Sequence, residues 1–386
     1  MAAKDKDISA KNRKAGDGKP AGAAHASKDQ EARAQRELGI VGPHGDMRLA
    51  SVIIEGYSLE LRDGDGFVGD VASGTAFRQM LEAWRRLYAV MDGKDPLGSK
   101  STRELSKKQI DALAAKSAEA ARAVEHASED YALQLSEVVQ RFLKQPTWRG
   151  VERVILGGGF HQSEFGGRAI ERVRALLKAA KVPLELRTLR HHADEGGLIG
   201  WVHLAPPALL QSYDAILAVD IGGTNVRCGI VQTHLHRAPD MSLAEVPRRE
   251  KWAHARDKPR RDELVEGIAT MLEDLIAHAE KKSIRLAPYI GVACPGLIVE
   301  DGSIAGGTQN LPGNWESTRF HLPRDLCERL PHIGQGRTQV CLHNDAVVQG
   351  LSELPFTQDV KGWAVLTVGT GLGNASYTNR APQKSK

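Results

Sequence analysis

One stretch of nine residues, Val219–Arg227, constrains the fold of this chain more than any other. It reads Val-Asp-Ile-Gly-Gly-Thr-Asn-Val-Arg, and apolar runs at residues 215–219 and 226–232 flank it. Two glycines between two apolar runs are typical of a tight β-hairpin. The hairpin turn brings together a carboxylate at the end of a strand, two glycines and a hydroxyl group.

This hairpin predicts a phosphate-binding site. Because Gly222 and Gly223 have no Cβ, their backbone N–H groups can approach phosphate oxygens closely. Thr224 and Asn225 add side-chain donors, and Asp220 is placed to hold a Mg²⁺ ion through water. A bare Asp-x-Gly-Gly equally fits an ordinary turn, and so the prediction rests on the whole stretch.

Two further glycine turns follow predicted strands. Gly369-Thr370-Gly371 comes after an apolar run at 363–368, and with the first turn it could clamp a triphosphate from both sides. Gly157-Gly158-Gly159 lies where a strand at 151–156 meets a helix, so it could pack against an adenine ring or offer a helix N-terminus to phosphate. Each turn alone also fits an ordinary loop.

Asp345 is the candidate general base. It lies in His343-Asn344-Asp345-Ala346, between a predicted strand at 340–343 and a predicted helix at 346–353. Transfer of a phosphoryl group to an alcohol needs a base beside the attacking hydroxyl, and Asn344 would then orient the acceptor. The alternative is that this pair only caps the helix, a common role for Asn and Asp.

A polar loop at residues 306–315 follows Cys294-Pro295-Gly296. It contains Thr308 and Asn310, which could donate and accept hydrogen bonds with several sugar hydroxyls. A Gly/Pro-rich surface connection is the alternative interpretation.

The chain of 386 residues is long enough for two domains. Nine Lys/Arg against six Asp/Glu in residues 1–37 account for most of the net charge of +4, so nucleic-acid binding is not expected. Residues 1–46 are predicted to be a disordered tail, and residues 381–386 a short tail. No apolar run approaches the roughly 20 residues of a membrane span, and no signal-peptide core precedes the first domain, which favours a cytoplasmic protein.

The order of predicted elements indicates an α/β protein of two lobes. Strand, helix, strand and helix alternate between residues 151 and 204, which predicts a mostly parallel sheet. Pro206-Pro207 opens a predicted linker, 206–214, between lobes at 47–205 and 215–380. The four cysteines form no CxxC pair, and we expect buried thiols at Cys228 and Cys294.

With these motifs, residues 215–380 resemble the ROK family of sugar kinases and repressors. The resemblance implies the two-lobed actin-like ATPase fold, also called ribonuclease H-like, and ATP with Mg²⁺ as cofactors. It implies that Asp345 is the base, that Asn344 and Asn310 contact the sugar, and that the turns Gly222–Asn225 and Gly369–Gly371 bind the ATP phosphates.

The order of the lobes differs from that family, in which a second lobe follows the Gly-Thr-Gly turn. Here residues 47–205 resemble that second lobe, on segments at 72–76, 154–159 and 195–200. Of these, Val154–Gly159 resembles the adenosine-binding turn. We therefore expect a circular permutation, which is plausible because chain ends lie at the surface. The alternative is a fusion of fragments from different active sites.

Two family features are missing, the Glu-x-Gly-His sugar motif and the cysteine zinc loop. Residues 63–71 stand where the family has its zinc loop, so no structural zinc is expected. Asp70 lies near the position of the family's sugar-binding glutamate. We predict an ATP-dependent, glucokinase-like hexose kinase with a sugar as its partner and no membrane contact, and leave a homodimer open. The alternatives are a sugar-responsive regulator without catalysis and an ATPase or phosphotransferase with another acceptor.

Overall fold

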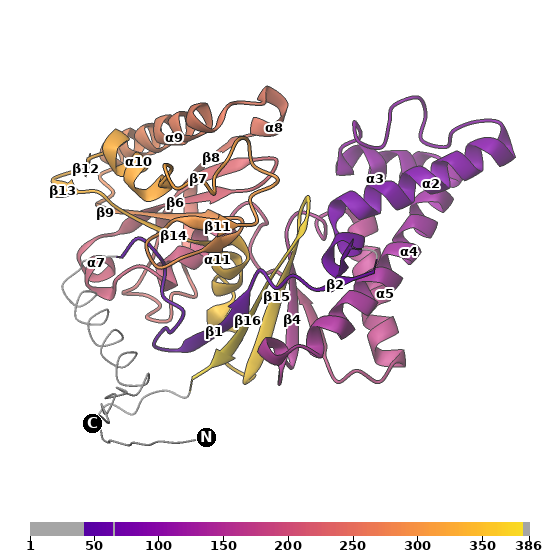
Figure 1. The fold of residues 1–386 in the computed structure, drawn as a ribbon, viewed down its shortest axis with the longest axis horizontal. Coiled ribbons are helices and arrows are strands. Elements are labelled where there is room, and N and C mark those ends of the chain that lie inside the picture. The colour runs from indigo at the N-terminus through magenta and orange to yellow at the C-terminus, as the bar shows by residue number, and fades with distance from the viewer. Residues whose placement is uncertain (1–41, 65, 381–386) are drawn as a thin grey trace, which may run out of the picture.

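The computed structural model describes residues 42–64 and 66–380, and these contain two five-stranded sheets (Figure 1). The first sheet has the order β14-β9-β6-β7-β8. Its strands are β6 (Ala215–Ile221), β7 (Val226–Gln232), β8 (Glu245–Trp252), β9 (Leu286–Cys294) and β14 (Gln339–Asn344). β6, β9 and β14 run parallel, whereas β7 is antiparallel to both of its neighbours. The predicted hairpin of β6 and β7 is confirmed.

The second sheet combines strands from both halves of the chain, in the order β1-β16-β15-β4-β5. They are β1 (Val52–Tyr57), β4 (Arg153–Gly157), β5 (Glu185–Thr188), β15 (Gly362–Val368) and β16 (Leu372–Asn379). This corrects the predicted lobe at 215–380, because β15 pairs with β4 and β16 pairs with β1. The sheet is also mixed rather than mostly parallel, since β16 is antiparallel to both of its neighbours.

Helices separate and cover the two sheets in layers (Figure 1). α9 and α10 cover the outer face of the first sheet, α6 and α11 lie between the sheets, and α2, α4 and α5 cover the outer face of the second. The helices are α2 (Gly74–Asp92), α3 (Lys107–Lys116), α4 (Ala118–Leu143), α5 (Glu164–Ala179), α6 (Gly196–Ile199), α7 (Pro207–Ser212), α8 (His254–Asp257), α9 (Arg261–Lys281), α10 (Leu322–Arg329) and α11 (Asp345–Leu351).

Short elements complete the described chain. They are the strands β2 (Arg62–Asp63), β3 (Gly66–Phe67), β10 (Leu297–Ile298), β11 (Ile304–Gly306), β12 (His332–Ile333) and β13 (Gly336–Arg337), and the 3₁₀ helices η1 (Val68–Ala72), η2 (Pro146–Trp148), η3 (Gly200–His203) and η4 (Leu354–Phe356). Among the described helices, none combines the length and the apolar character that crossing a membrane requires.

Serine side chains fix where the helices on the second sheet begin. The hydroxyls of Ser73, Ser106, Ser117 and Ser163 accept hydrogen bonds from backbone N–H groups in the first turns of α2, α3, α4 and α5. Ser117 has an extended backbone, and so it ends α3 and begins α4 within the alanine-rich segment 106–143. Hydroxyl caps thus explain why this segment forms two helices.

Two predictions about connecting segments need correction, and one strand has no counterpart among the predicted elements. Residues 42–46 of the predicted tail lie along β14, where the Gly45 N–H donates to the Leu342 oxygen at 3.0 Å. Part of the predicted linker 206–214 is the helix α7, because proline suits the first turn of a helix. β8 has no apolar alternation in its sequence, since it is a half-exposed edge strand. The rest of the tail and residues 381–386 lie outside the described residues.

The close packing of α11 against η3 gives a stability prediction. A Cβ on Gly200 would lie 1.7 Å from the Val348 oxygen, whereas a Cβ on Gly167 in α5 would meet nothing within 4 Å. We expect Gly200→Ala to lower the free energy of unfolding by about 1–3 kcal/mol through overpacking. The matched variant Gly167→Ala should raise it by about 0.5–1 kcal/mol. Chemical denaturation measures both; equal effects would contradict this account of the packing.

Candidate active site

The β6–β7 turn is a compact backbone loop held from two sides. The Gly222 N–H donates to the Asn225 oxygen at 2.9 Å, and Nε2 of the buried His254 donates to the Gly222 oxygen at 2.8 Å. A Cβ on Gly223 would lie 2.9 Å from the Cβ of Asn310. The turn therefore sits directly against the polar loop, and a side chain at residue 223 would force the two apart.

The second glycine turn, between β15 and β16, faces the first. The hydroxyl oxygens of Thr224 and Thr370 are 3.1 Å apart, within hydrogen-bond distance. The N-terminus of α2 holds this turn as well, since the Gly74 N–H donates to the Gly369 oxygen at 2.9 Å and the Thr75 hydroxyl donates to the Thr370 oxygen at 2.8 Å. The structure thus brings together the turns at 222–225 and 369–371.

The third glycine turn, Gly157–Gly159, lies beside the second. Gly158 has a φ of +79°, and a Cβ there would lie 2.3 Å from the oxygen of Val368, the residue before Gly369. The Gly158 N–H donates to Oε1 of Gln349 at 3.1 Å. Since Gln349 is on α11, the same short helix carries Asp345 at its start and contacts the third turn farther on.

Two carboxylates, the buried Asp220 and the half-buried Asp345, lie near the end of β9 in the first sheet, close enough for the charge of Asp220 to act on Asp345. β9 pairs with both β6 and β14, so Asp220 and Asn344 flank its end at Ala293 and Cys294. Burial, and then the charge of Asp220, raise the pKa of Asp345 to about 7. Burial also raises the pKa of Asp220, against the opposing effect of Arg227. A carboxylate with a pKa near neutrality is suited to accept a proton.

Arg227 joins Asp220 to a charge network that the motif does not reveal. Its Nη1 donates to Asp220 at 3.0 Å and its Nε donates to Asp194 at 2.5 Å. Lys251 also donates to Asp194, at 2.9 Å. Burial disfavours the charged form of Asp194, but Lys251 and Arg227 outweigh this and lower its pKa to about 2. Asp194 lies two residues before Gly196-Gly197, and nothing in its sequence context indicates this pairing.

The predicted sugar contacts lie in different environments. Asn310 is exposed between the first two turns, and Thr308 is buried with its hydroxyl donating to Glu316 at 2.9 Å. The Asn344 amide donates to Gly296 and Ser58 and accepts from Ala346 and Val347, so a sugar contact would require one of these bonds to exchange. Asp70 is exposed in η1, and among the described residues no hydrogen bond joins its side chain to the rest of the site.

The side chains near the end of β9 fit a divalent cation whose other ligands are phosphate oxygens and water. Among the described residues, no group of three or more His, Cys, Asp or Glu is placed to hold a metal ion. Mg²⁺ is usually bound by one or two carboxylates, with phosphate oxygens and water completing its octahedron. Asp220, a buried carboxylate near the negative charge of Asp345, meets that requirement.

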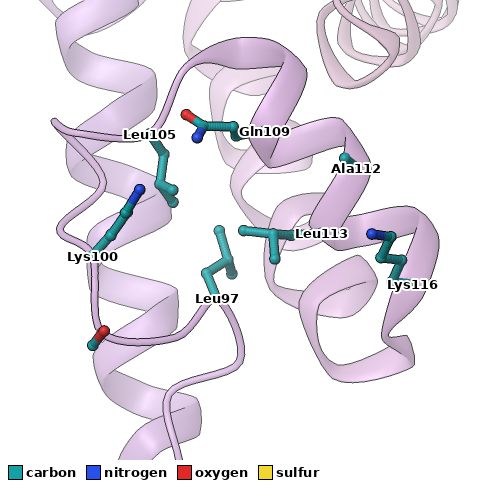
Figure 2. Close-up of a pocket in the computed structure, with 8 residues that line it drawn as sticks. Leu97, Lys100, Leu105, Gln109, Ala112, Leu113 and Lys116 are labelled. Atoms are coloured by element: carbon teal, nitrogen blue, oxygen red, sulfur yellow. The ribbon is translucent and has the colours of Figure 1, made fainter.

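A surface pocket of about 370 Å³ lies apart from these residues, between α3 and the loop before it (Figure 2). Leu97, Leu105 and Leu113 form its apolar wall, and Lys100 and Lys116 lie at its edges. None of the predicted site residues lines it.

Comparison with known proteins identifies the second part of the chain. Residues 216–385, less than half of the chain, match the model of the ROK family. This match confirms the predicted resemblance to the ROK family for that segment. The family match supports the predicted two-lobed, actin-like ATPase fold. A search of curated proteins finds no significant match.

Solved structures match in part. One is "a putative sugar kinase" from Cytophaga hutchinsonii, with 21% identity over 44% of this chain and 52% of that one, at a TM-score of 0.32. Another is "a putative N-acetylmannosamine kinase" from Listeria monocytogenes, with 25% identity over 43% and 47% and a TM-score of 0.30. The chain spans about half the length of each, and at these scores we draw no function from the likeness.

The raised pKa of Asp345 predicts a dependence of stability on pH. The folded protein holds this proton up to about pH 7, whereas an unfolded Asp releases it near pH 3.9. The wild type therefore loses stability as pH rises through this interval, and Asp345→Asn does not share that loss. The denaturation midpoint of Asp345→Asn minus that of the wild type, measured without nucleotide or Mg²⁺, should increase between pH 5 and pH 8. For the exposed control Asp274→Asn, the same difference in midpoint should stay constant with pH. A constant difference for Asp345→Asn would contradict the raised pKa of Asp345.

Proposed function

We propose that this protein is an ATP-dependent sugar kinase that transfers a phosphoryl group to a hexose hydroxyl. The observation that carries the proposal is the half-buried carboxylate of Asp345, with a pKa of about 7, close to Asp220 at the start of the first of two glycine turns that Thr224 and Thr370 join. The match of residues 216–385 to a family that includes sugar kinases supports it.

The glycine turns are proposed to bind the polyphosphate. Backbone N–H groups at Gly223 and Gly371 would approach phosphate oxygens, with the hydroxyls of Thr224 and Thr370 as added donors. Gly222 would shape the turn, because its N–H donates to the Asn225 oxygen. Asn225 ends the first turn, and its side chain is the remaining donor in that loop. Gly157–Gly159, against the end of β15, would support the adenosine.

Asp345 would accept the proton of the sugar hydroxyl during its attack on the γ-phosphorus. The bond from the hydroxyl oxygen to phosphorus forms while the bond from phosphorus to the β,γ-bridging oxygen breaks, and ADP leaves with that oxygen. Asp220 would hold Mg²⁺ through water, and that ion would neutralise phosphate charge. Thr308, Asn310, Asn344 and Asp70 are the proposed sugar contacts.

A second candidate is an ATPase or phosphotransferase with a non-sugar acceptor. The hydrogen bonds that already occupy the Asn344 amide favour it, because they leave that side chain no free donor for a sugar. A coupled assay of ADP release with hexoses, amino sugars or no acceptor separates the two. ADP release that depends on a hexose supports the sugar kinase, and equal release without any acceptor contradicts it.

Asp345→Asn tests the base directly. Removing the proton acceptor should lower the turnover number by about 10²-fold or more while nucleotide affinity stays unchanged. Asp274→Asn, an exposed substitution on α9, is the control for a charge change away from the site. The assay is sugar-dependent ADP release, with nucleotide affinity measured by calorimetry. Near-normal turnover in Asp345→Asn would remove Asp345 from its role.

We also propose that the lobes are joined in circularly permuted order. The second sheet supports this, because β1, β4 and β5 precede the ROK segment while β15 and β16 lie within it. Arg380 lies next to β1, since its N–H donates to the Ser51 oxygen and its guanidinium donates to the Leu49 oxygen, both at 2.9 Å.

This adjacency gives a test of the permutation. A rearranged chain would begin near residue 206, and a flexible linker of about ten residues would join Arg380 to Gly42. We expect it to fold with an unfolding midpoint close to the original and to keep its sugar-dependent ADP release. The control lacks the linker, so that residues 206–380 and 42–205 are separate chains. A rearranged chain that fails to fold would contradict the proposal.

A further inference from the structure

Lys107 reaches the third glycine turn from a different layer of the molecule. It is the first residue of α3, and its partly buried side chain places Nζ 2.8 Å from the position that a Cβ on Gly159 would take. A residue larger than glycine at position 159 would therefore displace this ammonium group. Lys107 thus lies over the turn that also contacts Gln349 of α11.

The surroundings of Lys107 are cationic. Its pKa is lowered to about 8, first by burial and then by the charges of Arg78, Lys251 and Arg227, while Asp194 opposes them. Asp194 is already bonded to Arg227 and Lys251. Among the described residues, no Asp or Glu oxygen lies within 4.0 Å of the Lys107 Nζ. The protein thus collects positive charge here without supplying a carboxylate to pair with Lys107.

An anion beside Gly159 would offset this imbalance. An ammonium group that is partly removed from water is stabilised by a nearby negative charge, and a phosphate oxygen accepts a strong hydrogen bond from it. Because the third turn has no side chains, Gln349, Val368 and Lys107 approach its backbone closely. Lys108, the next residue on α3, is exposed and serves as a comparison.

We propose that Lys107 binds the polyphosphate of a nucleotide that lies on the Gly157–Gly159 turn. The identity of the ligand rests on the proposed kinase function; the position of the cation does not. The ammonium group donates to non-bridging phosphate oxygens from the side of α3. Lys107 is a binding residue and transfers no proton in the reaction.

Calorimetry with Mg·ATP and with adenosine tests this assignment at pH 7.5. Lys107→Met should weaken the binding of Mg·ATP by about tenfold or more, because a charged hydrogen bond to phosphate is lost. The affinity for adenosine should stay unchanged, since adenosine has no phosphate. Lys108→Met should bind both ligands as the wild type does, and Lys107→Arg should retain most of the ATP affinity.

The pH dependence adds a readout that a merely structural lysine would not give. Between pH 7.5 and pH 9 the wild type should lose ATP affinity as Lys107 loses its proton, whereas Lys107→Arg, which stays charged, should lose much less. The other charged or titratable groups that face Lys107 are Arg78, His161, Asp194, Arg227 and Lys251, and all of them are present in both proteins.

The outcomes separate this inference from the proposed function. A wild type that binds no ATP overturns both. ATP binding that Lys107→Met leaves unchanged, or a loss of adenosine affinity equal to the loss of ATP affinity, overturns the role of Lys107 alone. If Lys107→Met does not fold, the comparison of pH profiles between the wild type and Lys107→Arg decides, and parallel profiles overturn the inference.

Discussion

The burial of α11 between two sheets is the constraint on which the rest of this structure depends. The helix has only seven residues, and all of them after Asp345 are buried. Asn344 ends β14 and caps the helix with its side-chain oxygen, while its amide nitrogen holds the Pro-Gly loop through Gly296. A short helix without this cap and without a sheet on each side would not be stable alone. Its burial is also what removes Asp345 from water and raises its pKa.

Contacts between distant segments surround the start of that helix. Thr224 meets Thr370 across the sheets, and Gln349 holds Gly158. Gly197, at the start of α6, lies so close to Asp220 that a Cβ would come within 2.9 Å of its carboxylate carbon. Glycine is therefore required at several of these positions for one physical reason. Backbone must approach backbone, or a charged group, more closely than a side chain permits.

Around the start of α11, some charged side chains are paired with each other and others are not. Arg227 is bonded to both Asp220 and Asp194, and Lys251 shares Asp194, so these four side chains form one network. Asp345 lies outside it as a carboxylate with a raised pKa, and Lys107 lies outside it as a cation with a lowered one. A phosphate with its magnesium ion would supply both the negative and the positive charge that these two positions lack, which unites the proposed kinase chemistry with the proposed role of Lys107.

The sequence by itself determined the local features of this protein. Two apolar runs around Gly222-Gly223 specify the β6–β7 hairpin, and serines specify the starts of α2 to α5, because turn and cap preferences act over a few residues. The tertiary structure alone decided that β15 and β16 join the sheet of β4, that Arg227 pairs with Asp194, and that Asp345 has a pKa near 7. Strand pairing between distant segments, burial and the distance between charges depend on how the whole chain folds, and neither local propensity nor motif spacing encodes them.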